Sequence, residues 1–289
     1  MKTRLMLAVL LLLALFVTAC QPQGAALPQD PLEAVKTIAD KQKEVKTQHI
    51  DLTMALSLKA DGLTGDMAQA GAFLKNFKAN LNVSGDVDSA KEDFALKGDL
   101  DLGPLTTLIT QGQDKLNFEV VKVGEKLYTK ANVGDKADQW NTTDAPKSTT
   151  EMTQTNPLNP EMVMSLLKQS SKAEKLADEK IGDVDTYHYK VTLDPATLID
   201  SIAKLAATSG APASDTTQLD QAKKYLKDAI LEVELWVGKQ DLLTRQTKVH
   251  FNLNLKDVPE MQGATALIDF LLTDKATKVN EPVTITAPK

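Results

Sequence analysis

Aromatic residues, cysteine and histidine are all scarce in this sequence of 289 residues. Phe, Trp and Tyr together make up 4% of it, so a core must consist mainly of Leu, Val, Ile, Ala and Met. The single cysteine, Cys20, excludes a disulfide within the chain and a cysteine-based metal site. The three histidines, His49, His188 and His250, are far apart in the sequence and give little basis for a zinc site. We therefore expect no metal and no other cofactor.

An excess of positive charge is lacking as well. The chain has 33 Lys and Arg against 39 Asp and Glu, for a formal net charge of −6. Non-specific affinity for nucleic acids comes from clustered Lys and Arg, so this balance argues against a nucleic-acid partner. The composition, 42% hydrophobic and 25% charged, is that of an ordinary globular protein.

The N-terminal segment has the pattern of an export signal. Lys2 and Arg4 precede an apolar run, Leu5 to Phe16, that is too short to span a hydrocarbon core of about 30 Å comfortably. The sequence Val17-Thr18-Ala19-Cys20 then resembles a bacterial lipobox, in which the cysteine is diacylated and becomes the new N-terminus. The alternative is a plain signal peptide followed by an incidental cysteine. Two acyl chains make a stable anchor, so we expect attachment to the extracytoplasmic face of the cell membrane.

This interpretation divides the chain into three parts. Residues 1–19 form the signal peptide, and residues 20–29 form the lipidated cysteine and a flexible tether rich in Pro, Gly, Ala and Gln. Residues 30–288 form the folded domain.

The folded part is predicted to start with a helix that leads into a long strand. Asp30, Pro31 and Glu33 provide an N-cap, a proline in the first turn and an acid three residues after the cap. We expect the side chains of Leu32, Val35, Ala39 and Val45 to lie near one face. From Ile50 to Lys59 apolar and polar residues alternate, which predicts a half-buried antiparallel strand.

Similar alternation continues through most of the remaining chain. Further strands are expected at 79–83, 94–96, 100–102, 116–120, 127–128, around 140, 173–181, 186–193, 230–237, 242–255 and 282–286. Helices are expected at 162–168, 194–208 and 219–226, a short amphipathic stretch at 66–77, and a mixed pattern at 258–273. Turns are expected at Gly85-Asp86, Gly103-Pro104, Gly124-Glu125 and Gly134-Asp135.

The order of these segments predicts an α+β fold. We expect a single strongly curved antiparallel sheet, a half-barrel of about eleven strands, wrapped around several amphipathic helices. A two-sheet sandwich would also satisfy the strand patterns, but it leaves the apolar stripes of the helices without a partner.

An ordered set of motifs resembles the LppX/LprG family of bacterial lipoproteins and, more distantly, the LolA/LolB-like carriers. In chain order, the set is the lipobox, the helix from Asp30, Gly124 to Tyr128 (GEKLY), the strand around Trp140, the helix after Asn156-Pro157, Leu235 to Gly238 (LWVG), Leu242 to Arg245 (LLTR) and Asn280 to Pro288 (NEPVTITAP). The resemblance covers roughly residues 30–288. It implies a hydrophobic cavity that binds acyl chains and a role in moving lipids or glycolipids through the cell envelope. Insertions at 61–78 and 143–160 depart from the mycobacterial pattern, so the identity of the ligand does not carry over.

A carrier of this kind needs aliphatic side chains on its cavity wall, because an acyl chain that leaves a membrane loses roughly 0.8 kcal/mol per methylene. The candidate lipid-binding residues are Leu52, Met54, Leu56, Leu58, Phe94, Leu96, Phe118, Val120, and Leu198 and Ile202 on a covering helix. Each of them could equally be an ordinary core residue.

Catalytic motifs are weak in this sequence. Ser165 and Lys168 match a Ser-x-x-Lys pattern, but no accompanying Ser-Asp-Asn or Lys-Thr-Gly is present, so we interpret them as the polar edge of a short helix. The pairs Asp99/Asp101 and Asp183/Asp185 are interpreted as a solvated strand face and a turn, and His188 as an ordinary strand residue.

Three functional hypotheses follow. The first is a non-enzymatic, membrane-anchored carrier of a lipid or glycolipid, which would exchange its ligand with a membrane, an envelope transporter or an acceptor protein. The second is a protein-interaction or sensor lipoprotein on the same scaffold. The third is a surface enzyme, for which the sequence offers no candidate residues.

Overall fold

The structure is a computed structural model, and it describes residues 26–63, 75–133, 137–145, 167–168, 170, 172–195, 197, 199, 223–256 and 263–289. Its helical elements are α2 (Pro31–Lys41), η1 (Gln42–Glu44), α4 (Pro104–Ile109) and η3 (Leu226–Asp228), of which η1 and η3 are 3₁₀ turns. Its strands are β1 (Thr47–Asp61), β2 (Phe77–Asp88), β3 (Asp93–Asp101), β4 (Leu116–Val123), β5 (Lys126–Ala131), β6 (Asn141–Asp144), β7 (Lys172–Lys175), β8 (Glu179–Ile181), β9 (Val184–Thr192), β10 (Ile230–Gly238), β11 (Thr244–Leu255) and β12 (Thr265–Thr277).

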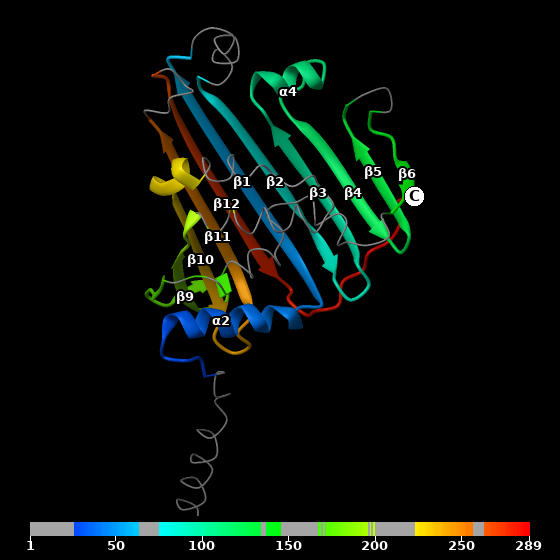
Figure 1. The fold of residues 1–289 in the computed structure, drawn as a ribbon. Coiled ribbons are helices and arrows are strands. Elements are labelled where there is room, and N and C mark those ends of the chain that lie inside the picture. The colour runs from blue at the N-terminus through cyan, green and yellow to red at the C-terminus, as the bar shows by residue number, and fades with distance from the viewer. Residues whose placement is uncertain are drawn as a thin grey trace, which may run out of the picture.

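All twelve strands belong to one antiparallel sheet (Figure 1). The order is β6-β5-β4-β3-β2-β1-β12-β11-β10-β9-β7, with β8 also paired to β9. The first strand therefore lies beside the last one, and two antiparallel meanders extend to either side of this central pair. The edge strands β6 and β7 do not pair with each other, so the sheet is open. The single antiparallel sheet expected from the sequence is confirmed, and the described part is mostly β.

The sheet is twisted, but it is not strongly curled, so the expectation of a strongly curved half-barrel is wrong. Bulges and similar irregularities are what bend a sheet sharply. Strand β1 pairs with β12 from His49 to Asp61 and with β2 from Thr47 to Leu58 in unbroken register. A register shift does occur in the β10–β11 pair, between Trp236 and Val237.

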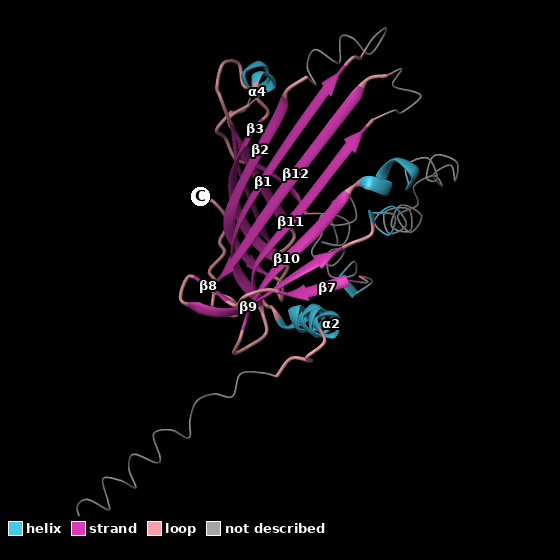
Figure 2. Ribbon diagram, turned by 90° about the vertical axis from the view of Figure 1, so that its left-hand side faces the viewer, coloured by secondary structure: helices cyan, strands magenta, loops and turns pink. Residues whose placement is uncertain are grey.

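Helix α2 lies across the sheet at the end opposite α4 (Figures 1 and 2). Its start is as predicted: the side chain of Asp30 accepts a hydrogen bond from the backbone N–H of Glu33 at 2.9 Å, and Pro31 occupies the first turn. The buried residues of the helix are Ala34, Val35, Ile38 and Ala39, whereas Leu32 and Val45 are only half-buried. The buried face of the helix is thus rotated about the helix axis relative to the predicted face.

Two segments near the C-terminus differ from their prediction. The segment 258–273, expected to have a mixed pattern, includes the first nine residues of β12, which has apolar residues on both of its sides because Leu267 and Leu271 face away from Ile268 and Phe270. The segment Pro282–Thr286 alternates but forms no strand. Both edges of β1 are already paired with β2 and β12, and the last residues run across the end of the sheet toward β6 (Figure 1).

Other differences concern the ends of elements. The expected turn at Gly85-Asp86 lies inside β2, where Gly85 pairs with Ile50 and Leu96. A Cβ on Gly85 would come within 2.0 Å of the carbonyl oxygen of Ala95, so glycine is needed there for close strand approach rather than for a turn.

The strands expected at 94–96 and 100–102 are the two ends of β3, and the strand expected at 173–181 is divided into β7 and β8. Most residues of the stretch at 66–77 and of the helices expected at 162–168 and 194–208 are outside the described residues, as is the first half of the helix expected at 219–226, whose described residues 223–226 are helical.

Candidate functional site

The register of β1 with its two neighbours gathers apolar side chains on one side of the sheet. Met54 pairs with Leu81 on β2 and with Leu272 on β12, and Leu56 pairs with Ala79 and Phe270. Successive side chains of a strand point to opposite sides, so Leu52 and Leu58 share this side. We call it the apolar face, and the opposite side, which carries Asp51, Thr53 and Ser57 of β1, the polar face.

The candidates on β3 and β4 belong to the apolar face as well. Leu96 pairs with Gly85 on β2 and with Val120 on β4, and Phe118 lies two residues before Val120. Phe94 lies two residues before Leu96, on the same side. The structure therefore brings eight of the ten predicted residues onto one face. The other two, Leu198 and Ile202, are outside the described residues.

The apolar face has two parts that differ in burial. Below α2, a core cluster includes Ala34, Val35 and Ile38 of the helix and Val191, Val233 and Leu235 of β9 and β10, all essentially inaccessible to solvent. Farther along the sheet, the eight candidate residues are all half-buried. Leu52 packs against the edge of the core cluster. The face thus changes from a filled core to a half-buried apolar wall.

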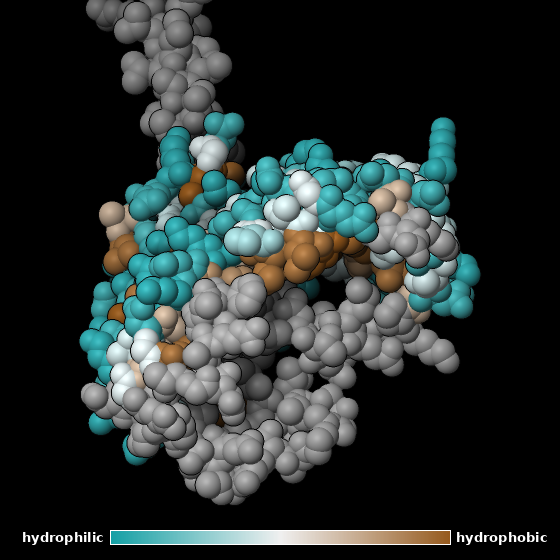
Figure 3. All heavy atoms as spheres, turned by 90° about the horizontal axis from the view of Figure 1, so that it is seen from above, coloured by the Kyte–Doolittle hydropathy of each residue, from teal (hydrophilic) through white to brown (hydrophobic). Residues whose placement is uncertain are grey.

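Figure 3 shows the apolar and polar faces from above, with hydrophobic residues gathered on one side of the sheet and hydrophilic residues on the other. A shallow cavity of about 390 Å³ lies at the β4–β6 end, and its lining includes Phe118, Val120, Thr129 and Ala131. The register places these four side chains on the apolar face. The lining also includes polar residues, among them Gln139, Asn141 and the ion-paired Glu119 and Lys130 of the polar face.

Gly98 shapes the wall beside Phe118, and sequence analysis did not identify it. A Cβ at this position would come within 2.7 Å of Cζ of Phe118 and within 2.3 Å of the carbonyl oxygen of Asn82. The phenyl ring therefore lies over the glycine. The alternating pattern gives no signal for this role, because a glycine in a strand has no side chain to assign to a face.

The polar face is covered by ion pairs. Examples are the ion pairs of Lys130 Nζ with Glu119 Oε1 at 2.8 Å and of Lys190 Nζ with Glu232 Oε1 at 2.8 Å, and the hydrogen bond between His250 Nε2 and Asp269 Oδ1 at 2.8 Å. Such exposed pairs contribute little to stability individually. Their repetition across neighbouring strands identifies this side as the one that contacts water.

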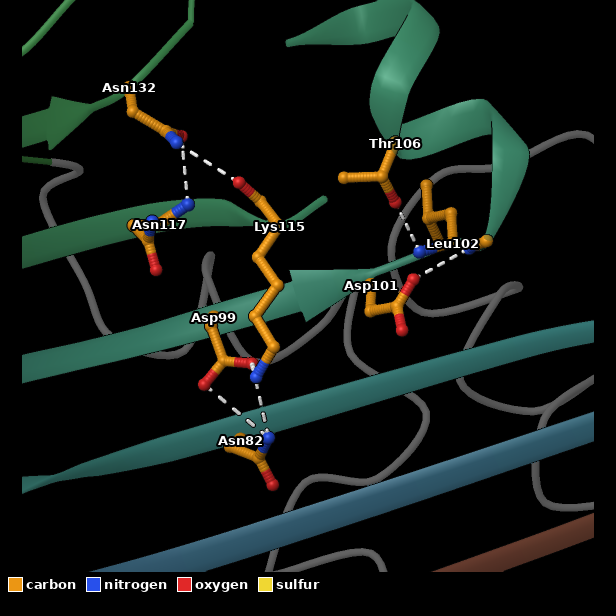
Figure 4. Close-up of polar contacts among 9 residues, drawn as sticks. Asn82, Asp99, Asp101, Leu102, Thr106, Lys115, Asn117 and Asn132 are labelled. Atoms are coloured by element: carbon orange, nitrogen blue, oxygen red, sulfur yellow. Dashed lines mark hydrogen bonds and ion pairs between the residues drawn. The ribbon is translucent and has the colours of Figure 1, made fainter. Parts of the chain in front are cut away.

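Asp99 is part of this network, as the solvated interpretation of Asp99 and Asp101 predicts (Figure 4). Lys115 Nζ donates to Asp99 Oδ1 at 2.7 Å, and the Asn82 amide donates to the same carboxylate at 3.2 Å. These hydrogen bonds lower the pKa of Asp99, and the bond from Lys115 has the largest effect. Asp101 instead accepts a hydrogen bond from the backbone N–H of Gly103, in the turn before α4. The groove over these residues, about 540 Å³, is lined largely by polar side chains and is a poor site for an acyl chain.

The remaining catalytic candidates have structural partners. Lys168 Nζ donates to Asp40 Oδ1 of α2 at 2.5 Å, while Ser165 is outside the described residues. The ring of His188 stacks on Trp236 with a centroid distance of 4.2 Å and hydrogen-bonds to Glu234 at 3.0 Å. Within the described parts of the chain, no group of three or more His, Cys, Asp or Glu is arranged to hold a metal ion.

Asp274 is a second residue of the apolar face that sequence analysis did not identify. It lies on β12 between Leu52 of β1 and Thr247 of β11. Its Oδ1 is buried and has no hydrogen-bond partner. Burial, with a smaller contribution from the negative charge of Asp51, raises the pKa of Asp274 to about 6. The signal in the sequence was an aspartate in phase with Ile268, Phe270 and Leu272.

Three further facts concern the predicted anchor. Cys20 and the rest of the lipobox are outside the described residues. Leu27, within the predicted tether, packs against the core cluster. The described residues contain no helix that is long and apolar enough to cross a membrane.

Comparison with known proteins gives similarity at the level of structure. No protein-family model and no curated protein sequence matches this chain. The crystal structure of the Mycobacterium tuberculosis lipoprotein LppX is 13% identical, covers 89% of this chain and 100% of its own, and superposes with a TM-score of 0.42. LprF from Mycobacterium bovis is 13% identical, with 88% and 96% covered and a TM-score of 0.41.

A more distant similarity is to a putative outer membrane lipoprotein-sorting protein domain from Vibrio parahaemolyticus, at 12% identity, with 83% of this chain and 91% of that chain covered and a TM-score of 0.22. The chain is thus similar to the proteins that its ordered motifs resemble. At these identities and TM-scores the similarity assigns neither a ligand nor an activity to it.

Proposed function

We propose that this protein is a membrane-anchored, extracytoplasmic lipoprotein that binds the acyl chains of a lipid or glycolipid against its apolar face and carries the lipid within the cell envelope. The observation that supports this function is the half-buried apolar wall on β1 to β4 and β12. A side chain such as Leu56 or Phe118 on this wall retains surface that an acyl chain can cover. Each methylene covered contributes roughly 0.8 kcal/mol.

The division of the sheet into two faces supports the same function. The polar face has ion pairs that fix its side chains and keep it in contact with water. A lipid would therefore bind on the opposite side, where aliphatic residues of neighbouring strands form continuous rows. No group transfer is part of this function, so the role is non-enzymatic.

Anchoring belongs to the proposal as well. Residues 1–19 are a signal peptide in this scheme, and diacylated Cys20 holds the domain 30–288 on the outer side of the membrane. A helix with Leu198 and Ile202 would cover the bound chain. Loading and release would then occur next to the bilayer, in exchange with a membrane or a partner protein of the envelope.

Substitution on the two faces of β1 tests the function. Residues 21–289 would be purified from the native host without detergent, extracted with organic solvent and examined by mass spectrometry. We expect one stoichiometric lipid species in the unchanged protein. Leu56→Asp places a charge on the apolar wall and should abolish loading, whereas Ala55→Asp, one residue away on the polar face, should leave it unchanged.

Circular dichroism would establish that both variants are folded. An unchanged protein that is empty and takes up no fluorescent fatty-acyl probe would contradict the lipid-binding function and favour the interaction module. Equal loading of a folded Leu56→Asp variant would contradict the assignment of the wall.

A further inference from the structure

Asp274 lies where the two parts of the apolar face meet. Leu52, its partner on β1, packs against the core cluster, and Leu272 and Ala276, the residues before and after it on the same side of β12, are both buried. Leu52 itself is half-buried, and β1 continues from it through Met54 and Leu56 along the half-buried wall. A carboxylate in this row interrupts an otherwise apolar surface.

One oxygen of this carboxylate, Oδ1, is buried without a hydrogen-bond partner. Thr247, beside it on β11, has no charge, and the charged group that acts on it is the carboxylate of Asp51 on β1, which is repulsive. Lys275, the next residue of β12, points to the other side of the sheet and is exposed. An acceptor that is removed from water in this way is stabilised by any molecule that brings a donor to it.

The wall that starts beside Asp274 is long enough for an acyl chain. From Leu52 to Leu58, β1 advances by six residues, which corresponds to about 20 Å at a rise of 3.4 Å per residue. A lipid whose chains follow β1 and β12 would have its polar end close to one limit of this wall. At the Asp274 end, that polar group would meet the unpartnered oxygen.

We propose that Asp274 binds a hydroxyl or ammonium group next to the acyl chains of the cargo lipid, and so selects lipids with a free hydrogen-bond donor at that position. This inference rests on the proposed lipid-binding function and specifies its substrate class. A neutral or cationic donor satisfies the buried oxygen, whereas an ether or ester oxygen at the same place leaves two acceptors facing each other.

Competition between matched lipids tests the proposal. The full chain would be reconstituted in phosphatidylcholine vesicles that contain a trace of dioleoylglycerol with a photoactivatable acyl chain. Unlabelled dioleoylglycerol, its methyl ether and the analogue with an amine in place of the hydroxyl would then compete for crosslinking. We expect the hydroxyl or the amine lipid to compete at least tenfold better than the methyl ether, and the better of these two identifies the donor.

Two variants of Asp274 and one control complete the experiment. Asp274→Asn and Asp274→Leu should lose the preference over the methyl ether, and Asp274→Leu should still bind the ether. Asp269→Leu, on the polar face of the same strand, should keep the preference. If the variants fail to fold, the comparison of the three lipids on the unchanged protein still tests the preference for a hydrogen-bond donor.

The outcomes separate this inference from the function on which it rests. Equal competition by all three lipids, or a preference that survives in the Asp274 variants, would overturn the role of Asp274 and leave lipid binding intact. Absence of crosslinking with every lipid would overturn the lipid-binding function itself.

Discussion

The carboxylates of this protein differ in pKa according to the face on which they lie. On the polar face, hydrogen bonds from Lys115 and His250 lower the pKa of Asp99 and Asp269, respectively. On the apolar face, burial raises the pKa of Asp274 to about 6. The same residue type is thus stabilised as an anion by partners on one side and destabilised by loss of water on the other.

This difference gives a testable dependence of stability on pH. Because the pKa of Asp274 is higher in the folded protein, about 6 against 3.8, the folded state binds the proton more tightly. The contribution of Asp274 to the free energy of unfolding is therefore fully present below pH 4. It falls as the pH rises through about 6, by roughly 3 kcal/mol in total.

Asp274→Asn lacks this titration. Urea denaturation between pH 4 and pH 7 should show that the free energy of unfolding of the unchanged protein falls relative to that of the variant. The acids of lowered pKa are present in both proteins and cancel in the difference. A difference that stays constant over this range would exclude a raised pKa for Asp274.

At the scale of the element, α2 shows how local sequence and tertiary contacts act together. The cap at Asp30 starts the helix, and the side chain of Gln42 ends it against another part of the chain. That side chain donates to the carbonyl of Leu242 at 3.3 Å and accepts from the N–H of Thr244 at 3.1 Å. Both ends are therefore fixed, one by local residues and one by the β10–β11 hairpin.

Removal of the cap should weaken this packing. Asp30→Ala leaves the backbone N–H of Glu33 without its side-chain acceptor and should lower the free energy of unfolding by about 1 kcal/mol. Asp30→Asn keeps an acceptor oxygen and should have a much smaller effect. Thermal denaturation of the three proteins would measure both, and equal stability of Asp30→Ala and the unchanged protein would contradict the role of the cap.

At the scale of the molecule, an open sheet has to protect its two edges. Both edge strands, β6 and β7, have only four residues, and β7 contains Lys172 and Lys175. Short edges with charged side chains discourage pairing with a second copy. The sheet can therefore remain open without the closure of a barrel.

The anchor is a prediction about the whole chain. Cys20→Ser removes the thiol that the lipobox presents for acylation. In a bacterial host we expect the variant to lose the mass of the acyl chains and to leave the membrane-bound, detergent-extractable fraction. Ala26→Ser, in the predicted tether, should retain both properties. An unmodified Cys20 in the unchanged protein would favour the plain signal peptide.

Much of the fold could be predicted because its elements are locally encoded. The alternation in β1, the cap of α2 and the turn at Gly124-Glu125 depend on neighbouring residues, and each is present in the structure. The errors of the prediction arose where contacts between distant parts of the chain determine whether a segment forms a strand. Leu267 and Leu271 hide the alternation of β12. Pro282–Thr286 alternates but forms no strand, and both edges of β1 are already paired with β2 and β12.

The sequence by itself determined which residues belong to one face of each strand, because side chains of a strand alternate with a period of two. It could not determine which strands are neighbours. The tertiary structure placed β12 beside β1, and this pairing brought Asp274 next to Leu52 on the apolar face. Burial and the missing partner of Asp274 are consequences of that contact, so only the folded chain could make it a candidate for binding.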